Sequence, residues 1–254
     1  MKLSILSTVF NESAFLEYSL NSYLEYVDFV ALVEGSYLET QKLGASARSD
    51  DGTIEIIEKY RNDPKVHIVY ANEQTDKDQR NVGYKKIKEL NPDGFLLIID
   101  GDEVYQPQTF DLIYSTMKMM RKTDKKVAYF NSITFINDLK HYTNQFFPRL
   151  FDLKNSVEFV NDNYLSWNEP LKAEQVLYGQ GFSPIKYHHF AFTKGKERFL
   201  LKKHWWETRF GKPFKYSWYV DENGKINDKT HQIFLYEGKF PDIMKSHPMM
   251  QKEK

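Results

Sequence analysis

The sequence predicts an α/β fold in which helices cover both faces of a mostly parallel central sheet. Strand and helix patterns alternate through the first hundred of the 254 residues, which is the order of a βαβ series. Residues 95–99 are apolar throughout, as a parallel strand buried on both faces should be. Hydrophobic residues make up 41% of the chain, which excludes intrinsic disorder and allows a sizeable core.

In the first half of the chain, the spacing of apolar residues predicts each helix and strand. A helix is expected where Phe15, Leu16 and Leu20 share one face. Asp63-Pro64 ends a later helix, and the turn at residues 91–94 separates another helix from the fourth strand. The expected elements are, in order, strand 2–9, helix 11–26, strand 29–34, helix 54–61, strand 66–70, helix 78–90 and strand 95–99.

The pattern changes after residue 104. Residues 152–184 read as irregular, and the tail from Val220 is weakly patterned. No repeat or low-complexity linker separates the two halves, so one domain is expected. The expected elements here are helix 110–121, strands 127–136, 145–151 and 186–192, and helix 197–210.

Charge and cysteine content exclude several classes of protein. The chain has 35 Lys and Arg, 35 Asp and Glu, and no Cys. It therefore has no disulfides, thiolate zinc sites or cysteine nucleophiles, and it is not a uniformly basic nucleic-acid binder. Residues 1–103 hold 11 basic and 19 acidic side chains, and residues 104–254 hold 24 and 16. Either chance or one site with oppositely charged halves explains this asymmetry.

No targeting or membrane-spanning signal is visible in the sequence. The first seven residues are too short and too polar for a secretory apolar region, and no apolar run has spanning length. A cytoplasmic location is therefore expected, and peripheral attachment to a membrane stays open.

The strongest local motif is Asp100-Gly101-Asp102-Glu103, which directly follows the apolar strand at residues 95–99. Ligands of open parallel sheets bind beyond the carboxyl ends of the strands. Clustered carboxylates at that edge favour a hard cation such as Mg²⁺ or Mn²⁺, which bridges to substrate phosphates. The alternative is a polar turn that simply leaves the strand.

Polar residues follow other strands of the same series. Arg80 and Asn81 open a helix that could hold a phosphate or a base edge, although taken alone they are better explained by a capped helix with a surface Arg. Asn11 and Glu12 fit a helix start after the first strand. Glu34 ends the second strand, where a carboxylate can accept from a ribose hydroxyl or a base N–H.

Taken in order, these motifs resemble the family 2 glycosyltransferases with the GT-A fold. The resemblance covers most of residues 1–105, including the Ser-Asp-Asp-Gly-Thr stretch at 49–53, and the branch it looks closest to contains lipopolysaccharide-core-type transferases. It extends more thinly to the stretches at residues 147–151, 168–171 and 188–192. It implies a nucleotide-sugar-binding half at residues 1–104, an acceptor-side half at 105–219 and a C-terminal extension at 220–254.

The resemblance implies a metal-dependent, hexosyltransferase-type reaction that moves a sugar from a nucleotide-diphosphate donor, by expectation UDP-linked, with inversion. Mn²⁺ or Mg²⁺ is implied at the Asp-x-Asp motif. Asp102, His189 and Asp100 are the metal ligands it implies, with Asp102 favoured over Asp100. The donor-binding residues it implies are Asn11, Glu12, Glu34, Asp51, Arg80, Asn81, Asp100, Gly101 and Lys202.

The resemblance also points to a general base in the second half. Glu169 is the first choice and Asp162 the second, because an acceptor alcohol needs a base at neutral pH. The chain departs from the family pattern where Glu34 replaces an Asp, where residues 37–48 are inserted, and where Asn168 replaces a His. The acceptor stays open between a glycan, a lipid-linked glycan, a protein and a nucleobase.

Residues 194–215 carry eight Lys and Arg with interleaved aromatic residues. Three explanations fit these residues: a lid over the diphosphate, a surface for an anionic acceptor or membrane, or basic side chains whose aliphatic parts cover the core. In the third case, Lys202 or Lys203 is expected to reach the site. Trp167, Trp205 and Trp218 fit either sugar stacking or ordinary core packing.

Three alternatives to a glycosyltransferase remain. A nucleotidyltransferase would share the acidic site, but it normally has a Gly-rich loop after the first strand, which residues 7–12 lack. A nucleic-acid or anionic-surface binder would use residues 194–215. An inactive sugar-binding relative is the third.

Overall fold

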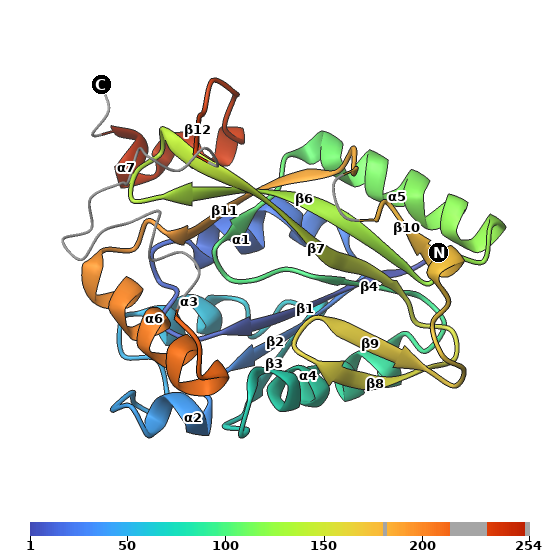
Figure 1. The fold of residues 1–254 in the computed structure, drawn as a ribbon, viewed down its shortest axis with the longest axis horizontal. Helices are drawn as coiled ribbons and strands as arrows, with labels where there is room; N and C mark the ends of the chain where they lie inside the picture. The colour runs from blue at the N-terminus through green and yellow to red at the C-terminus, as the bar shows by residue number, and fades with distance from the viewer. Residues whose placement is uncertain (180–181, 214–232, 252–254) are drawn as a thin grey trace.

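The computed structural model describes residues 1–179, 182–213 and 233–251 and confirms the expected α/β class. One curled sheet runs through the middle of the molecule with helices on both sides (Figure 1). The expected domain boundary at residues 219 and 220, Trp218 and Lys215 lie outside the described residues.

The N-terminal half contributes the parallel part of the sheet. Its strands lie in the order β3 (Val66–Tyr70), β2 (Phe29–Glu34), β1 (Leu3–Val9) and β4 (Phe95–Ile98). Every neighbouring pair among them is parallel, so their carboxyl ends share one edge. The connecting helices are α1 (Leu16–Tyr23), followed by the 3₁₀ turn η1 (Leu24–Tyr26), α2 (Leu38–Gln41), α3 (Thr53–Lys59) and α4 (Asp76–Leu90).

The second half extends the same sheet with mixed pairing. The order from β4 onward is β7 (His141–Asp152), β6 (Val127–Ile136), β11 (Lys186–Phe192) and β5 (Glu103–Val104). β7 is antiparallel to both β4 and β6, and β11 is parallel to β6. The division at residue 104 therefore falls inside one continuous sheet.

Alternating side chains of each central strand serve two separate cores. Ile5 and Leu97 face the core beneath α1, α3 and α5 (Pro107–Lys122). Leu6 and Leu96 face the opposite core beneath α4 and the hairpin of β8 (Ser156–Asn161) and β9 (Tyr164–Trp167). Because both faces are buried, these strands read as nearly continuous apolar runs in the sequence.

The remaining elements are short except for one. α6 (Lys196–Phe210) crosses the carboxyl edge of the sheet close to α2 (Figure 1). The others are the 3₁₀ turn η2 (Ala173–Gln175), β10 (Val176–Leu177), β12 (Phe234–Leu235), the 3₁₀ turn η3 (Asp242–Ser246) and α7 (Pro248–Gln251). Among the described helices, none has the length and apolar character needed to cross a membrane.

Several sequence-based expectations were wrong in detail: the strand expected at residues 145–151 begins at His141, and the helix expected at 110–121 begins at Pro107. The first helix begins at Leu16 rather than Asn11, because Asn11 adopts a left-handed φ of 52° and binds Asp50 and the Ser49 hydroxyl. Residues 152–184 are not all irregular, since the β8–β9 hairpin lies within them. Its short strands and bulged register, together with Asn-rich turns, hide the period of two.

Candidate active site

A pocket opens at the carboxyl ends of β1, β2 and β4, where sequence reasoning expected a ligand. The floor comes from the first half of the chain and one wall from β11 and α6. Its charged lining residues are Glu12, Asp76, Arg80, Asp100, Asp102, His189, Lys194, Arg198 and Lys202. Oppositely charged side chains from the two halves therefore do meet in one site.

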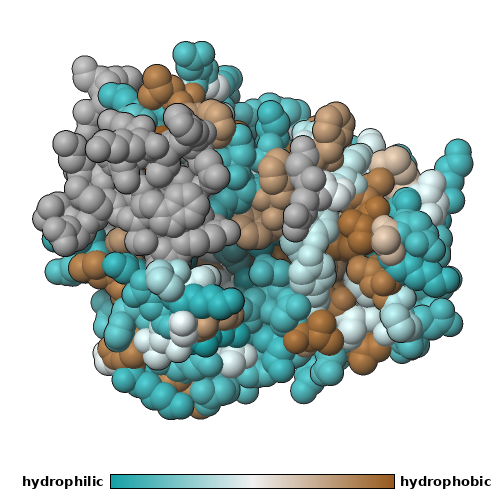
Figure 2. Space-filling view, viewed as in Figure 1, coloured by the Kyte–Doolittle hydropathy of each residue, from teal (hydrophilic) through white to brown (hydrophobic). Residues whose placement is uncertain are grey.

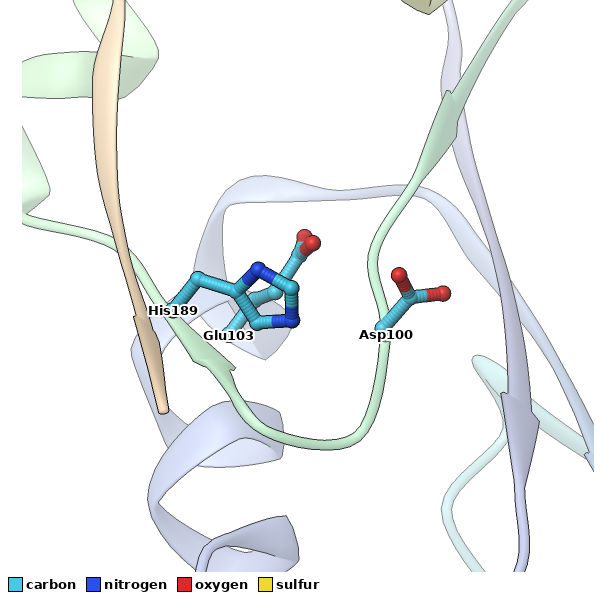
Figure 3. A group of neighbouring side chains, drawn as sticks. All are labelled: Asp100, Glu103 and His189. Atoms are coloured by element: carbon cyan, nitrogen blue, oxygen red, sulfur yellow. The ribbon is translucent and has the colours of Figure 1, made fainter. Parts of the chain in front are cut away.

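The acidic turn reaches the second half through a short strand pairing. Two-residue β5 runs antiparallel to β11, with Glu103 opposite His189. The Phe190 N–H also donates to the Asp102 carbonyl oxygen over 2.9 Å. This pairing places His189 against the acidic turn, as the resemblance implied (Figure 3).

Asp102 and His189 form a buried pair in the pocket, 5% and 7% exposed. His189 Nε2 lies 3.3 Å from Asp102 Oδ1, and Nδ1 lies 3.5 Å from the hydroxyls of Ser132 and Thr134. Burial lowers the pKa of His189 despite Asp102, which favours the neutral imidazole that a metal requires. Carboxylate and imidazole ligands at this spacing fit a divalent cation.

Asp100, Glu103 and His189 form a second group with ligand atoms close enough for one metal ion (Figure 3). Arg149, which is 2% exposed, contacts both acids of this group through Nη2, at 3.0 Å from Asp100 Oδ2 and closely at Glu103. Desolvation opposes ionisation of Asp100, but Arg149 and Arg80 hold the pKa of its carboxyl below the usual range. Arg149 therefore already supplies a positive charge to two acids of this group, Asp100 and Glu103.

Lys194 contacts two acids of the pocket, Asp102 and Glu12. Its ammonium lies 2.5 Å from Asp102 Oδ2 and also contacts the Glu12 carboxylate, which Arg198 approaches at 3.4 Å. Burial would lower the pKa of Lys194, yet Asp102 and Glu12 raise it. Glu12 therefore lines the pocket as expected, and Lys194 lies where it can compete with or support another cation on Asp102.

Arg80 links Asp100 of the acidic turn to Asp76 at the start of α4. Its Nη2 donates to Asp100 Oδ1 over 3.2 Å, and its Nε lies 3.1 Å from Asp76 Oδ1. Gly101 also lines the pocket, and a Cβ there would meet Glu12 and Val9 at 3.0 Å. Arg80 and Gly101 therefore both line the pocket, and their contact with a donor stays a prediction.

Four expected donor residues hold loops rather than line the pocket. Asn81 binds the backbone of Phe159 through both amide atoms. Asp51 accepts from the Ser13 N–H and from Thr53, which lowers the pKa of its carboxyl against partial burial. Asn11 and Glu34 bind the segment at residues 48–50. Contact of these four side chains with a nucleotide stays a prediction.

α6 forms part of the pocket wall through one face. Arg198 and Lys202 lie one turn apart on this face, followed by Trp205, and all three line the pocket. Burial lowers the pKa of Lys202, whose ammonium lies 5.0 Å from the Phe192 ring centroid. Hydrophilic residues cover much of the outer surface over α6 and α2 at the lower left of Figure 2. Some basic side chains of residues 194–215 therefore line the pocket, so this stretch does not form one external basic patch.

The two candidate bases lie at opposite ends of the β8–β9 hairpin. Asp162, in its turn, accepts from Arg209 of α6 over 2.9 Å and from the Lys77 N–H at the start of α4. Glu169 is exposed beyond β9, near Asn155 at the far end of the sheet. Neither side chain lines the described pocket, so both assignments stay predictions.

Sequence reasoning missed Tyr37, Asp76, Arg149 and Lys194 as site residues. Arg149 belonged to a stretch that supported the resemblance, and its position within an expected strand was a usable signal. Lys194 follows the His-containing strand β11 closely. Tyr37 and Asp76 carried no motif, because the insertion at residues 37–48 is what brings Tyr37 to Asp76.

Comparison with protein families decides the assignment of this chain. The sequence model of glycosyl transferase family 2 matches residues 4–194. The chain belongs to glycosyl transferase family 2. The resemblance and the GT-A fold class are thereby confirmed, while the lipopolysaccharide-core-type branch stays a prediction. No curated protein matches this family 2 chain in sequence.

Solved structures resemble this family 2 chain only distantly. S. aureus TarS 1-349 in complex with UDP-GlcNAc is 21% identical over 53% of this chain and 35% of its own, with a TM-score of 0.39. TarS 1-349 alone is 14% identical over 81% and 64%, with a TM-score of 0.44. A 4-diphosphocytidyl-2C-methyl-D-erythritol synthase is 12% identical over 60% and 75%, with a TM-score of 0.39. The chain spans about a third of the first TarS structure, so the family match alone carries the assignment.

Proposed function

We propose that this chain transfers a sugar from a nucleotide-diphosphate donor, UDP-linked, to an acceptor nucleophile with inversion. The observation that carries the proposal is the pocket itself, where Asp102 and His189 face Arg198 and Lys202 beyond the carboxyl ends of the parallel strands. This arrangement offers ligands for a cation and donors for phosphate oxygens in one place. Membership of family 2 supports the same reaction.

A divalent cation, Mn²⁺ or Mg²⁺, would be held by Asp102 and His189, with Asp100 beside them. When bound, it supplies Lewis-acid stabilisation for the diphosphate that leaves. Lys202 and Arg198 add fixed positive charge at the same end of the pocket. Because their positions are set by helix α6 before substrate arrives, they need little rearrangement as charge develops.

A base is needed to take the proton of an acceptor hydroxyl. Asp162 is the better of the two candidates, since Arg209 holds it beside α6 at the pocket end of the hairpin. Glu169, at the other end, would need a movement of the hairpin to reach the same place. A correctly placed carboxylate contributes roughly 10²–10⁴-fold to the rate.

The alternatives fit the pocket less well. A nucleotidyltransferase would bind a nucleoside triphosphate, and no Gly-rich loop follows β1 to hold one. A nucleic-acid binder would need the basic run on the surface, whereas Lys194, Arg198 and Lys202 of this run line the pocket. The nucleotidyltransferase and the nucleic-acid binder are each expected to bind a ligand other than a nucleoside diphosphate.

A thermal-shift panel tests the proposal. Ligands that bind only the folded protein raise its melting temperature. We expect UDP with Mn²⁺ to raise it more than UDP with EDTA, and more than UTP or a DNA oligonucleotide does. Preferential stabilisation by UTP would favour the nucleotidyltransferase, and no shift with any nucleoside diphosphate would overturn the proposed function.

A further inference from the structure

Both oxygens of the Asp102 carboxylate have partners within the protein. Oδ2 accepts from the ammonium of Lys194 over 2.5 Å, and Oδ1 lies 3.3 Å from His189 Nε2. Asp102 is 5% exposed, and only 9% of the Lys194 side chain is exposed. A lysine of this chain therefore already holds one oxygen of the carboxylate that the proposed function gives to a divalent cation.

Glu12 contacts the same ammonium of Lys194. Its Oε2 accepts from Lys194 Nζ, and its Oε1 lies 3.4 Å from Arg198 Nη2. Burial raises the pKa of Glu12, and Lys194 is the group that opposes this rise most, so the ammonium favours the ionised carboxylate. Two acids, Glu12 and Asp102, thus face two cationic side chains, and the charges of this group balance without a metal.

This balance makes the empty pocket a poor site for a free divalent cation. The cation would meet an ammonium on the same carboxylate, and like charges close together repel strongly in a buried site. Lys194 would have to leave Asp102, which costs the charge-assisted hydrogen bond between them. A diphosphate that enters with the cation brings the negative charge with which the released ammonium can pair.

The position of Lys194 in the chain suits an exchange of partners. It lies in the three-residue link at 193–195, between β11, which ends at Phe192, and α6, which begins at Lys196. Gly195 in this link adopts a left-handed φ of 86°, and a Cβ there would meet nothing within 4 Å. Because Lys194 is outside both regular elements, it can change partners without breaking a strand or a helix.

We propose that Lys194 competes with the divalent cation for Asp102: it pairs with Asp102 in the empty pocket and releases it when the cation and a diphosphate enter together. Lys194 thereby lowers the affinity of the empty pocket for free Mn²⁺ or Mg²⁺ and makes cation binding depend on the donor. The inference rests on the proposed function, because that function places the cation at Asp102.

Electron paramagnetic resonance titration of Mn²⁺ without nucleotide tests the inference on the wild type and three matched variants. Lys194→Gln removes the charge that contacts Asp102, and it should bind Mn²⁺ at least about tenfold tighter than the wild type, the effect of losing one charge-assisted competitor. Lys202→Gln removes another charge of the pocket, which acts on Asp102 only through its field, and should gain less than about threefold. Lys196→Gln, at an exposed position two residues on, should bind like the wild type.

The same titration with saturating UDP tests the link to the donor. The difference between the wild type and Lys194→Gln should shrink to less than about threefold, because the diphosphate gives Lys194 another partner and so couples the two binding events. Thermal melting checks that each variant is folded. Lys194→Met, which also lacks a hydrogen-bond donor, is a second variant that should bind free Mn²⁺ more tightly than the wild type.

Two results would overturn the inference and leave the proposed function standing. One is that both Lys194 variants bind free Mn²⁺ no more tightly than the wild type. The other is a gain in Lys202→Gln as large as that in Lys194→Gln, which would mean that Lys194 acts only through its field. If UDP with Mn²⁺ does not stabilise the wild type, the proposed function is wrong, and with it the dependence of cation binding on the donor.

Discussion

Asp102 contacts both a histidine and a lysine of the pocket. It contacts His189 and Lys194, one from β11 and one shortly after it. Desolvation opposes its ionisation, but Lys194 and His189 hold the pKa of the Asp102 carboxyl well below the usual range. The carboxylate is therefore charged across the physiological pH range.

Asp102→Asn should weaken Mn²⁺ binding by at least about 100-fold, because it removes the charged ligand oxygen. Electron paramagnetic resonance titration of free Mn²⁺ measures this affinity directly. Asp93→Asn, in the exposed turn before β4, is the control and should bind Mn²⁺ like the wild type. Equal affinities for all three proteins would exclude Asp102 as a ligand.

His188, the neighbour of His189, faces away from the pocket. Its Nε2 pairs with the Tyr236 hydroxyl at 2.6 Å, and its ring stacks on Phe135. Burial lowers the pKa of His188 to about 4. Below about pH 6.5 the unfolded chain takes up a proton that the folded protein refuses until about pH 4, so the free energy of unfolding falls as the pH drops through this window.

His188→Phe should remove this contribution, which is roughly 1.4 kcal/mol per pH unit at most. Urea unfolding at several pH values between 6.5 and 4 gives the slope for the variant and the wild type. His204→Gln, on the exposed side of α6, should keep the wild-type slope. An unchanged slope in His188→Phe would mean that His188 titrates alike in both states.

At the scale of elements, α4 packs so closely on the sheet at Gly83 that a Cβ there would have to displace buried side chains of β1 and β2. A Cβ on Gly83 would lie 2.2 Å from Leu6 Cδ1 and 2.7 Å from Val33 Cγ2. This close packing of α4 on β1 and β2 positions Arg80 and Asp76, about one and two turns earlier on the same helix.

Gly83→Val should therefore lower the free energy of unfolding by roughly 1–3 kcal/mol through overpacking. Lys85→Val introduces the same side chain at an exposed position of α4 and should cost less than about 1 kcal/mol, the helix-propensity effect alone. Chemical denaturation measures both. If the two variants are equally stable, α4 does not pack in this way.

The spacing of apolar residues in the sequence predicted the helices and strands that bury the same face along their length. Residues 127–136 and 186–192 were expected as strands and form β6 and β11 with those bounds. The helix expected at 78–90 starts two residues earlier, where Thr75 caps it by accepting from the Asp78 N–H. The β8–β9 hairpin and α2 could not be predicted, since their few buried residues leave no repeating pattern.

The site could be predicted where it followed strand ends, and not where it depended on packing between distant segments. Asp100, Asp102 and His189 were found because each adjoins or belongs to a buried strand. Asp76 was not, because its role depends on Tyr37 reaching it across 39 residues. Glu34 stands at the expected strand end, but the inserted segment uses its carboxylate.

At the scale of the whole molecule, Arg149 ties the two halves together. From β7 it contacts Asp100 and Glu103 of the acidic turn, and its Nε donates to the Tyr187 hydroxyl on β11 over 3.0 Å. Desolvation raises the pKa of Glu103 well above its usual range even with Arg149 beside it. Removing the guanidinium would leave buried acids without this counter-charge.

Arg149→Met should lower the free energy of unfolding by about 3–5 kcal/mol, the usual cost of breaking a buried ion pair from one side. Unfolding should still be a single transition, because β4 and β7 pair across the two halves. Arg61→Met, which breaks the exposed pair with Glu58, should leave the midpoint nearly unchanged. Two separate transitions in the wild type would mean that the halves fold independently.

The central claim is that the pocket between β4, β11 and α6 holds a metal and a nucleoside diphosphate. A crystal structure of the protein with UDP and Mn²⁺ tests it most directly. The account predicts an anomalous manganese peak about 2.0–2.6 Å from Asp102 and His189 Nε2, and the diphosphate of UDP beside Arg198 and Lys202. UDP bound elsewhere, or manganese with no contact to Asp102, would contradict it.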